Sequence, residues 1–160
     1  MAKTASKPES QDFKVVSSNR RAFHDYAIME TLETGIALTG SEIKSIRDGK
    51  ISLAEAYARI DDDELWLIGA HIPPYTHGAY ANHEPLRPRK LLAHASEIEH
   101  LRRQVEARGM TLVPLRVVLK RGKAKVDIGV ARAKKLYDKR ASESERQSKR
   151  DIERSLADRG

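Results

Sequence analysis

Six histidines are the side chains of this chain that come nearest to a metal-binding set. His71, His77 and His83 surround one long loop, and such a group could hold a metal ion that hydrolyses a phosphodiester bond. Their spacing matches no common ligand pattern, and no pair of carboxylates is fixed beside them. The acidic run at 61–63 lacks the other ligands of a calcium loop and is typical of a hairpin turn. A metal-dependent nuclease is therefore the least favoured hypothesis, and we expect neither a metal nor a cofactor.

Basic side chains offer a different chemistry, because they gather in separate segments of the chain. If the segments converge in the fold, they form a stripe that can follow the phosphates of a nucleic-acid backbone. The alternative is scattered, solvated charge. The residues concerned are Arg20, Arg21, Arg87, Arg89, Lys90, Lys120, Arg121, Lys123, Lys125, Arg132, Lys134 and Lys135. This pattern favours a polyanionic partner.

Composition agrees with that partner and narrows the compartment. The 160 residues carry 30 Lys and Arg against 23 Asp and Glu, a formal net charge of +7. Clustered charge of this size favours nucleic acid. The chain has no cysteine, which excludes disulfides and thiolate metal sites. No apolar run approaches the ~20 residues of a membrane span, and 1–11 lacks the apolar core of a secretory signal. We therefore expect a cytoplasmic protein that contacts no membrane.

Alternating apolar and polar residues predict several short antiparallel strands that position these charges. The expected strands are 26–33, 36–38, 56–60, 64–68, 111–120 and a return strand as far as 130. Turns are expected at Thr34-Gly35, at 61–63 and at Arg121-Gly122. Many short strands with few helices favour a small closed or nearly closed antiparallel barrel.

The last predicted hairpin has an apolar set on each strand. The residues expected to face inward are Val113, Leu115, Val117 and Leu119, followed by Val126, Ile128 and Val130. A period of two places such residues on one face of a strand. We therefore expect this hairpin to supply much of the core.

Two short helices are expected outside the barrel. Ser41 has the character of an N-cap, and Gly49 ends the first helix. Residues 96–99 have the pattern of a capping box, and Gly109 ends the second helix. Between the helices, Pro73-Pro74 begins a loop of about fifteen residues, a length that is often functional in a compact domain.

Four longer phrases carry a resemblance to a known family. In chain order they are NRRAFHDY at 19–26, ETGIALTGSEIKSIR at 33–47, RPRKLL at 87–92 and GVARAKKLYDKR at 129–140. Together they resemble the small protein B (SmpB) family, the SsrA-binding proteins of bacterial trans-translation. Several long phrases in the right order make the resemblance specific.

The resemblance implies a mainly β fold: a small antiparallel barrel of the oligonucleotide-binding (OB) type with short flanking helices and a basic C-terminal tail. It implies an RNA-binding body at 19–132 and a tail at 133–160. The segment at 1–18 is rich in Ser, Lys and Gln, a composition that predicts disorder. The tail would be disordered when free and helical on the ribosome.

The same resemblance implies an RNA-binding adaptor, not an enzyme. Such an adaptor binds the tRNA-like domain of transfer-messenger RNA (tmRNA) and delivers it to stalled ribosomes for trans-translation. The protein and its tail would stand in for the anticodon arm and codon, in the small-subunit decoding centre and the mRNA channel. No DNA partner is expected. The alternative is a generic basic RNA-binding or ribosomal protein.

Residues tied to RNA in the family match named positions here. Those tied to tmRNA are Asn19, His24, Glu33, Leu92, His94, Lys125, Lys134 and Lys135. Those beside the decoding centre are Asp138, Lys139 and Arg140. Asn, His and Glu can pair with base edges and 2′-hydroxyls, Leu can pack on a base, and Lys can hold phosphate.

Structural roles for some of these residues stay open. Asn19 could be a cap, His24 could brace the barrel, Glu33 could precede a turn and Leu92 could lie in the core. His94 stands where some relatives have Asn, and it can still donate and accept hydrogen bonds.

Overall fold

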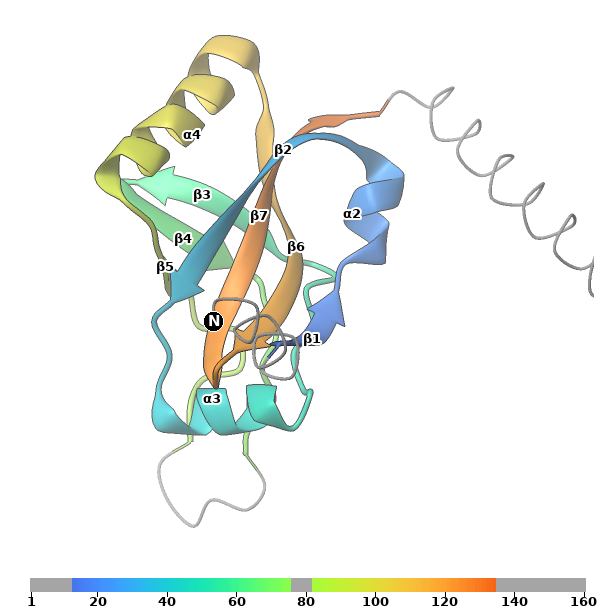
Figure 1. Ribbon diagram of the computed structural model, residues 1–160, viewed down its shortest axis with the longest axis vertical. Coiled ribbons are helices and arrows are strands. Elements are labelled where there is room, and N and C mark those ends of the chain that lie inside the picture. The colour runs from blue at the N-terminus through green and yellow to red at the C-terminus, as the bar shows by residue number, and fades with distance from the viewer. Residues whose placement is uncertain (1–12, 76–81, 135–160) are drawn as a thin grey trace, which may run out of the picture.

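The computed structural model of the chain describes residues 13–75 and 82–134, and Figure 1 shows how their elements are arranged. Strands dominate, and the short helices lie outside them. The elements in chain order are β1 (Phe13–Ser18), α2 (Arg20–Asp25), β2 (Tyr26–Ile36), α3 (Gly40–Arg47), β3 (Tyr57–Asp61), β4 (Glu64–Ile68), β5 (Arg89–Leu92), α4 (Ala95–Arg108), β6 (Thr111–Lys120) and β7 (Lys123–Ala133).

The strands form one antiparallel sheet that closes on itself. Around the ring the order is β7, β2, β5, β4, β3 and β6, and β6 pairs again with β7. One edge of β6 is shared, because β1 pairs along 116–120 while β3 pairs only through Ala58 and Leu112. The small antiparallel barrel expected from the sequence is confirmed. Val126, Ile128 and Val130 fill its interior as expected.

The expected inward set of β6 is wrong in part. Val117 and Leu119 lie in the main core, whereas Val113 and Leu115 join a second cluster with Ala22 and Ala131. The pairing of β6 with β7 shifts between Pro114 and Arg116, which is a β-bulge. One extra residue in a strand reverses the face to which the following side chains point. The bulge therefore divides the apolar set of β6 between two clusters.

The turn expected at Thr34-Gly35 does not exist, because β2 runs without interruption from Tyr26 to Ile36. Gly35 pairs with Lys125 of β7 on one side and with Leu92 of β5 on the other. The buried Thr34 hydroxyl donates to the Val126 carbonyl oxygen at 2.9 Å. Strand pairing on both sides satisfies the backbone here and outweighs the turn preference of glycine.

The hairpin turns at 61–63 and at Arg121-Gly122 are confirmed, and so are both helix-ending glycines. Asp62, Asp63 and Arg121 have φ values of 52°, 63° and 51°, the left-handed conformation that tight hairpin turns require. Gly49 and Gly109 have φ values of 80° and 64° just beyond α3 and α4.

Both helices begin two residues away from the cap predicted for them. Thr39, not Ser41, caps α3: its Oγ1 accepts the Glu42 N–H, and Glu42 accepts the Thr39 N–H. α4 follows His94, whose backbone N–H donates to the Glu97 carboxylate at 2.9 Å. Alternative cap residues stand close together in both segments, so the pattern alone does not choose the register.

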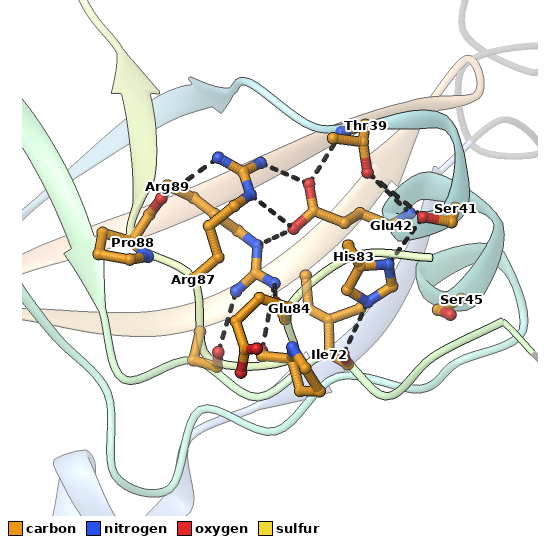
Figure 2. A network of polar contacts seen from close by, with 12 residues as sticks. Thr39, Ser41, Glu42, Ser45, Ile72, His83, Glu84, Arg87, Pro88 and Arg89 are labelled. Carbon is orange, nitrogen blue, oxygen red and sulfur yellow. Dashed lines mark hydrogen bonds and ion pairs between the residues drawn. The ribbon is translucent and has the colours of Figure 1, made fainter. Parts of the chain in front are cut away.

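Glu42 and Arg89 form an ion pair in the interior, where neither side chain is exposed to solvent. Arg87 adds a second guanidinium, which donates to the Glu42 carboxylate at 2.5 Å. Arg89 Nη1 donates to the Ala70 carbonyl oxygen at 3.0 Å, and Nη2 donates to that of Pro85 at 3.2 Å. Figure 2 shows these groups converging from α3, from β5 and from the segment before β5. The network ties the first residue of β5 to α3.

The Glu42 carboxylate gives the fold a pH dependence. Burial by itself would raise its pKa, but hydrogen bonds from Arg87, Thr39 N–H and Arg89, with the Arg89 charge, lower the pKa to about 2. A carboxyl group whose pKa falls on folding adds stability above its unfolded pKa and loses it as the pH falls through the folded value. We expect the unfolding free energy to drop by about 3 kcal/mol through Glu42 between pH values of about 5 and about 2, measured by urea denaturation.

Two variants separate this contribution from that of other carboxylates. Glu42→Gln should flatten the acid limb of the profile and lower stability near neutral pH. Glu99→Gln removes a half-exposed carboxylate on α4 and should leave the wild-type profile unchanged. A Glu42→Gln profile parallel to that of the wild type would show that Glu42 is not the group that titrates.

Candidate nucleic-acid interface

Strands β5, β2 and β7 place three residues side by side in a row across the sheet. Leu92 of β5, Gly35 of β2 and Lys125 of β7 are direct cross-strand neighbours. Leu92 is 50% exposed, although it is a large apolar residue. A Cβ added to Gly35 would lie 3.2 Å from Leu92 Cβ, so the absence of a side chain at Gly35 leaves room for the Leu92 side chain. We call this set the Leu92–Lys125 row.

Glu33 lies on the same face, two residues before Gly35 in β2. It is a strand residue opposite Asp127, so the interpretation that it precedes a turn is wrong. Lys120 of β6 forms an ion pair with the Glu33 carboxylate. Both side chains are more than 40% exposed, at 42% and 43%, so the pair is open to solvent and to a ligand. Glu33 thus offers an acceptor beside the Leu92–Lys125 row.

An aromatic ring accompanies the cations of β6. The Arg116 guanidinium and the Lys120 ammonium lie 5.6 Å and 5.7 Å from the centre of the Phe13 ring. Phe13 opens β1, and it is 37% exposed. The sequence predicted disorder for 1–18, which is wrong for 13–18: these residues pair with β6. Residues 1–12 lie outside the described part. Nothing in the polar composition of the segment pointed to Phe13 as a surface residue.

A second group lies where β7 ends beside α2. His24 Nδ1 lies 2.8 Å from the Asp25 carboxylate, and the Lys134 backbone N–H donates to the Asp25 carbonyl oxygen at 2.9 Å. Lys134 Nζ lies 3.4 Å from the Phe23 carbonyl oxygen. The structure therefore brings His24 and Lys134 together, although 110 positions separate them in the chain.

Asn19 differs from the other expected RNA-binding residues because it is buried, with 7% exposed. Its Oδ1 accepts the Ala22 N–H at 3.2 Å and caps α2. Its Nδ2 donates to the carbonyl oxygens of Pro114 at 2.9 Å and Leu53 at 3.4 Å. In this conformation Asn19 acts by holding α2, and with it His24, against the barrel. His94 is exposed at the start of α4, two residues beyond Leu92.

The basic segments converge only in part. Arg89 is fully buried and Arg87 is bound to Glu42, so neither belongs to a phosphate-binding stripe. Lys90 is ion-paired with Glu64 at 2.9 Å. The sequence alone does not show whether an arginine is buried or exposed, so the burial of Arg89 was missed. The partner that decides, Glu42, is distant in the chain.

The remaining predicted residues belong to the C-terminal tail and to the candidate metal set. Lys135, Asp138, Lys139, Arg140 and His77 lie outside the described residues. Among residues 13–75 and 82–134, no group of three His, Asp or Glu side chains could hold a metal ion. His83 is buried, with Nδ1 2.8 Å from Ser41 Oγ and Nε2 2.8 Å from the Ile72 carbonyl oxygen. In the same ranges no helix has the length and apolar character to cross a membrane.

The fold and this surface define a class: a small, basic, antiparallel β-barrel with short helices around it. The chain belongs to the SmpB family, because the family described as SmpB protein matches residues 16–158. The match covers the barrel and continues through most of the C-terminal segment. The resemblance seen in the four sequence phrases is therefore confirmed.

Individual relatives agree with the family. The SsrA-binding protein of Roseiflexus sp. (strain RS-1) is 59% identical over 147 residues, which cover 91% of this chain and 93% of the relative. That of Desulfitobacterium hafniense (strain DSM 10664 / DCB-2) is 52% identical and covers 94% of this chain and 97% of its own. A chain of the solved structure "tmRNA-SmpB: a journey to the center of the bacterial ribosome" is 51% identical, with a TM-score of 0.63. The alignment covers 75% of this chain and 85% of that chain.

Proposed function

We propose that this protein is an RNA-binding adaptor that holds the tRNA-like domain of tmRNA and carries it to stalled ribosomes in the cytoplasm for trans-translation. The observation that carries the proposal is the Leu92–Lys125 row with Glu33. It combines an exposed apolar side chain, an acceptor and cations on one face of a rigid barrel. The SsrA-binding relatives and the tmRNA–SmpB structure support the choice of RNA.

The proposed chemistry is binding alone, without catalysis. Leu92 packs on an exposed base, Glu33 accepts from a base edge or a 2′-hydroxyl, and Lys125 holds a phosphate. His94, His24, Lys134 and Lys135 extend this contact, and Asn19 supports α2. The tail from Asp138 to Arg140 acts in the decoding centre, so that protein and tail stand in for anticodon arm and codon.

Leu92→Ala tests the body of the interface. Loss of a half-exposed leucine from a base contact should weaken binding of the tRNA-like domain by about tenfold, since burial of such a side chain contributes about 1.5 kcal/mol. Competition gels at one fixed salt concentration will measure the affinity. Leu86→Ala is the matched control: Leu86 is 54% exposed but lies in the segment before β5, away from the row.

The same gels separate the adaptor from a generic structural RNA-binding protein. The adaptor should prefer the tRNA-like domain to an unrelated folded RNA of equal length, and Leu92→Ala should reduce that preference. Equal affinity of the wild type for both RNAs would contradict the proposed function. Equal losses for Leu92→Ala and Leu86→Ala would contradict the role of the row.

A further inference from the structure

Ser41 and His83 form a pair that takes no part in the surface described so far. Ser41 Oγ lies 2.8 Å from His83 Nδ1, and His83 Nε2 lies 2.8 Å from the Ile72 carbonyl oxygen. Figure 2 shows the imidazole between the other two residues, with both contacts drawn as dashed lines. A hydroxyl beside an imidazole that a third group orients is the arrangement of an activated nucleophile.

The hydrogen bonds of His83 decide which of its ring nitrogens carries the proton. A carbonyl oxygen can only accept, so Nε2 donates its N–H to Ile72, and the neutral ring has a lone pair on Nδ1. Nδ1 therefore accepts from Ser41, and the hydroxyl proton points at a base. Thr39 Oγ1 lies 3.4 Å from Ser41 Oγ, beyond the usual O–H···O distance, so a lone pair of Ser41 stays available for attack.

The start of α3 supplies a second requirement of acyl transfer, donors for a developing oxyanion. Gly40 and Ser41 are the first two residues of the helix, so their backbone N–H groups have no carbonyl partner within it. Such N–H groups stabilise negative charge on the oxygen of an attacked carbonyl. Beyond the helix and its chain neighbours, no atom lies within 4 Å of the place that a Gly40 Cβ would take. This side of the half-buried Ser41 is therefore open to a small molecule.

We propose that Ser41 is a modification site whose hydroxyl accepts an acyl group from a small activated ester, with His83 as the general base. Ser41 Oγ forms a bond to the acyl carbon while its proton passes to His83 Nδ1. The bond from that carbon to the leaving oxygen then breaks, and the leaving group departs with the electron pair. His83 returns to its neutral form by giving the proton to the leaving group or to water. The product is a serine ester, and its formation does not depend on RNA binding.

The test treats the full-length protein with p-nitrophenyl acetate and locates the acetyl groups by peptide mass spectrometry. Mapping separates the serine ester from acetylated lysines, which also react with this reagent. A general base contributes about 10²–10⁴-fold, so Ser41 should be acetylated at least about a hundredfold faster than a serine without a base. Ser41→Ala should remove the acetyl group from this peptide and leave the lysine background unchanged.

Ser96 is the matched control within the same chain. It is the second residue of α4, as Ser41 is the second residue of α3, and it is the more exposed of the two. In the part of the chain that the structure describes, Ser96 makes no hydrogen bond to a histidine, and His100 Nε2 lies 2.6 Å from the Glu30 carboxylate. Exposure and a helix N-terminus alone would thus favour Ser96. Equal acetylation of the two serines would overturn the inference.

His83→Gln separates the base from its structural role. Glutamine keeps one donor and one acceptor but has no basic nitrogen, so proton transfer is lost. Acetylation of Ser41 should fall by about a hundredfold, with the circular dichroism spectrum of the wild type retained. Unchanged acetylation in the folded variant would overturn the inference. If the variant does not fold, the ratio of Ser41 to Ser96 acetylation in the wild type decides. RNA affinity of the unmodified protein tests the proposed function separately.

Discussion

Arg89→Met is expected to lower the free energy of unfolding by about 3–5 kcal/mol, the usual cost of removing one partner from a buried ion pair. Arg89 is fully buried, and its guanidinium donates hydrogen bonds to the Glu42 carboxylate and to the carbonyl oxygens of Ala70 and Pro85. Methionine has similar length but donates no hydrogen bond, so each of the three acceptors loses the donors of Arg89. The buried Glu42 carboxylate is left with Arg87 and the Thr39 N–H. Urea denaturation near neutral pH will measure the change.

The next residue provides the control for this prediction. Lys90→Met removes a half-exposed cation whose partner is the half-exposed Glu64, and it should change stability by less than about 1 kcal/mol. If Arg89→Met does not fold, Arg89→Lys keeps the charge but loses the planar fork, and it should show an intermediate loss. A loss below about 1 kcal/mol for Arg89→Met would mean that the network contributes little to stability.

Changing Asp138, Lys139 and Arg140 together to alanine is expected to abolish tagging and leave RNA affinity within about twofold of the wild type. The reason is the proposed division of labour: the body holds tmRNA, while these three residues act in the decoding centre. Loss of charge-assisted contacts worth about 1.5–3 kcal/mol each would slow the ribosomal step by at least about a hundredfold. A tagging assay on a stalled message and a tmRNA gel will measure the two effects separately.

Two other variants serve as controls, one for tagging and one for RNA affinity. Ser144→Ala changes an uncharged position in the same segment and should tag normally. Leu92→Ala should lose RNA affinity first, and tagging only where tmRNA is not saturating. The division between body and tail would be wrong if the triple variant lost as much tmRNA affinity as Leu92→Ala.

Local periodicity predicted the barrel well, since hairpins such as 56–68 and 111–130 depend on neighbouring residues. Prediction failed where a distant partner decides. Gly35 suggests a turn by its own preference, yet β5 and β7 pair with it from both sides. Leu115 continues an apolar alternation, yet a bulge against β7 moves it to another cluster.

The candidate site shows the same limit. Glu33, Leu92 and Lys125 came from the family resemblance, and their separate positions in the chain do not reveal that they share one face. Arg89 was predicted to lie on the basic surface but is buried against Glu42. Phe13 was overlooked because a polar segment surrounds it, and only the pairing of β1 with β6 brings its ring to Arg116. Each of these depends on contacts between residues far apart in sequence.

The single residue pair between β3 and β6 leaves most of one β3 edge without a strand partner. An open edge of this kind can recruit a strand from another molecule and lead to aggregation. α4 lies along this edge: Arg102 is ion-paired with Asp63 at the β3–β4 turn, and Val105 lines the groove beside Ile60. α4 thus covers the open edge of β3 and prevents edge-to-edge association. A chain built largely of strands is thereby kept from pairing with other molecules through β3.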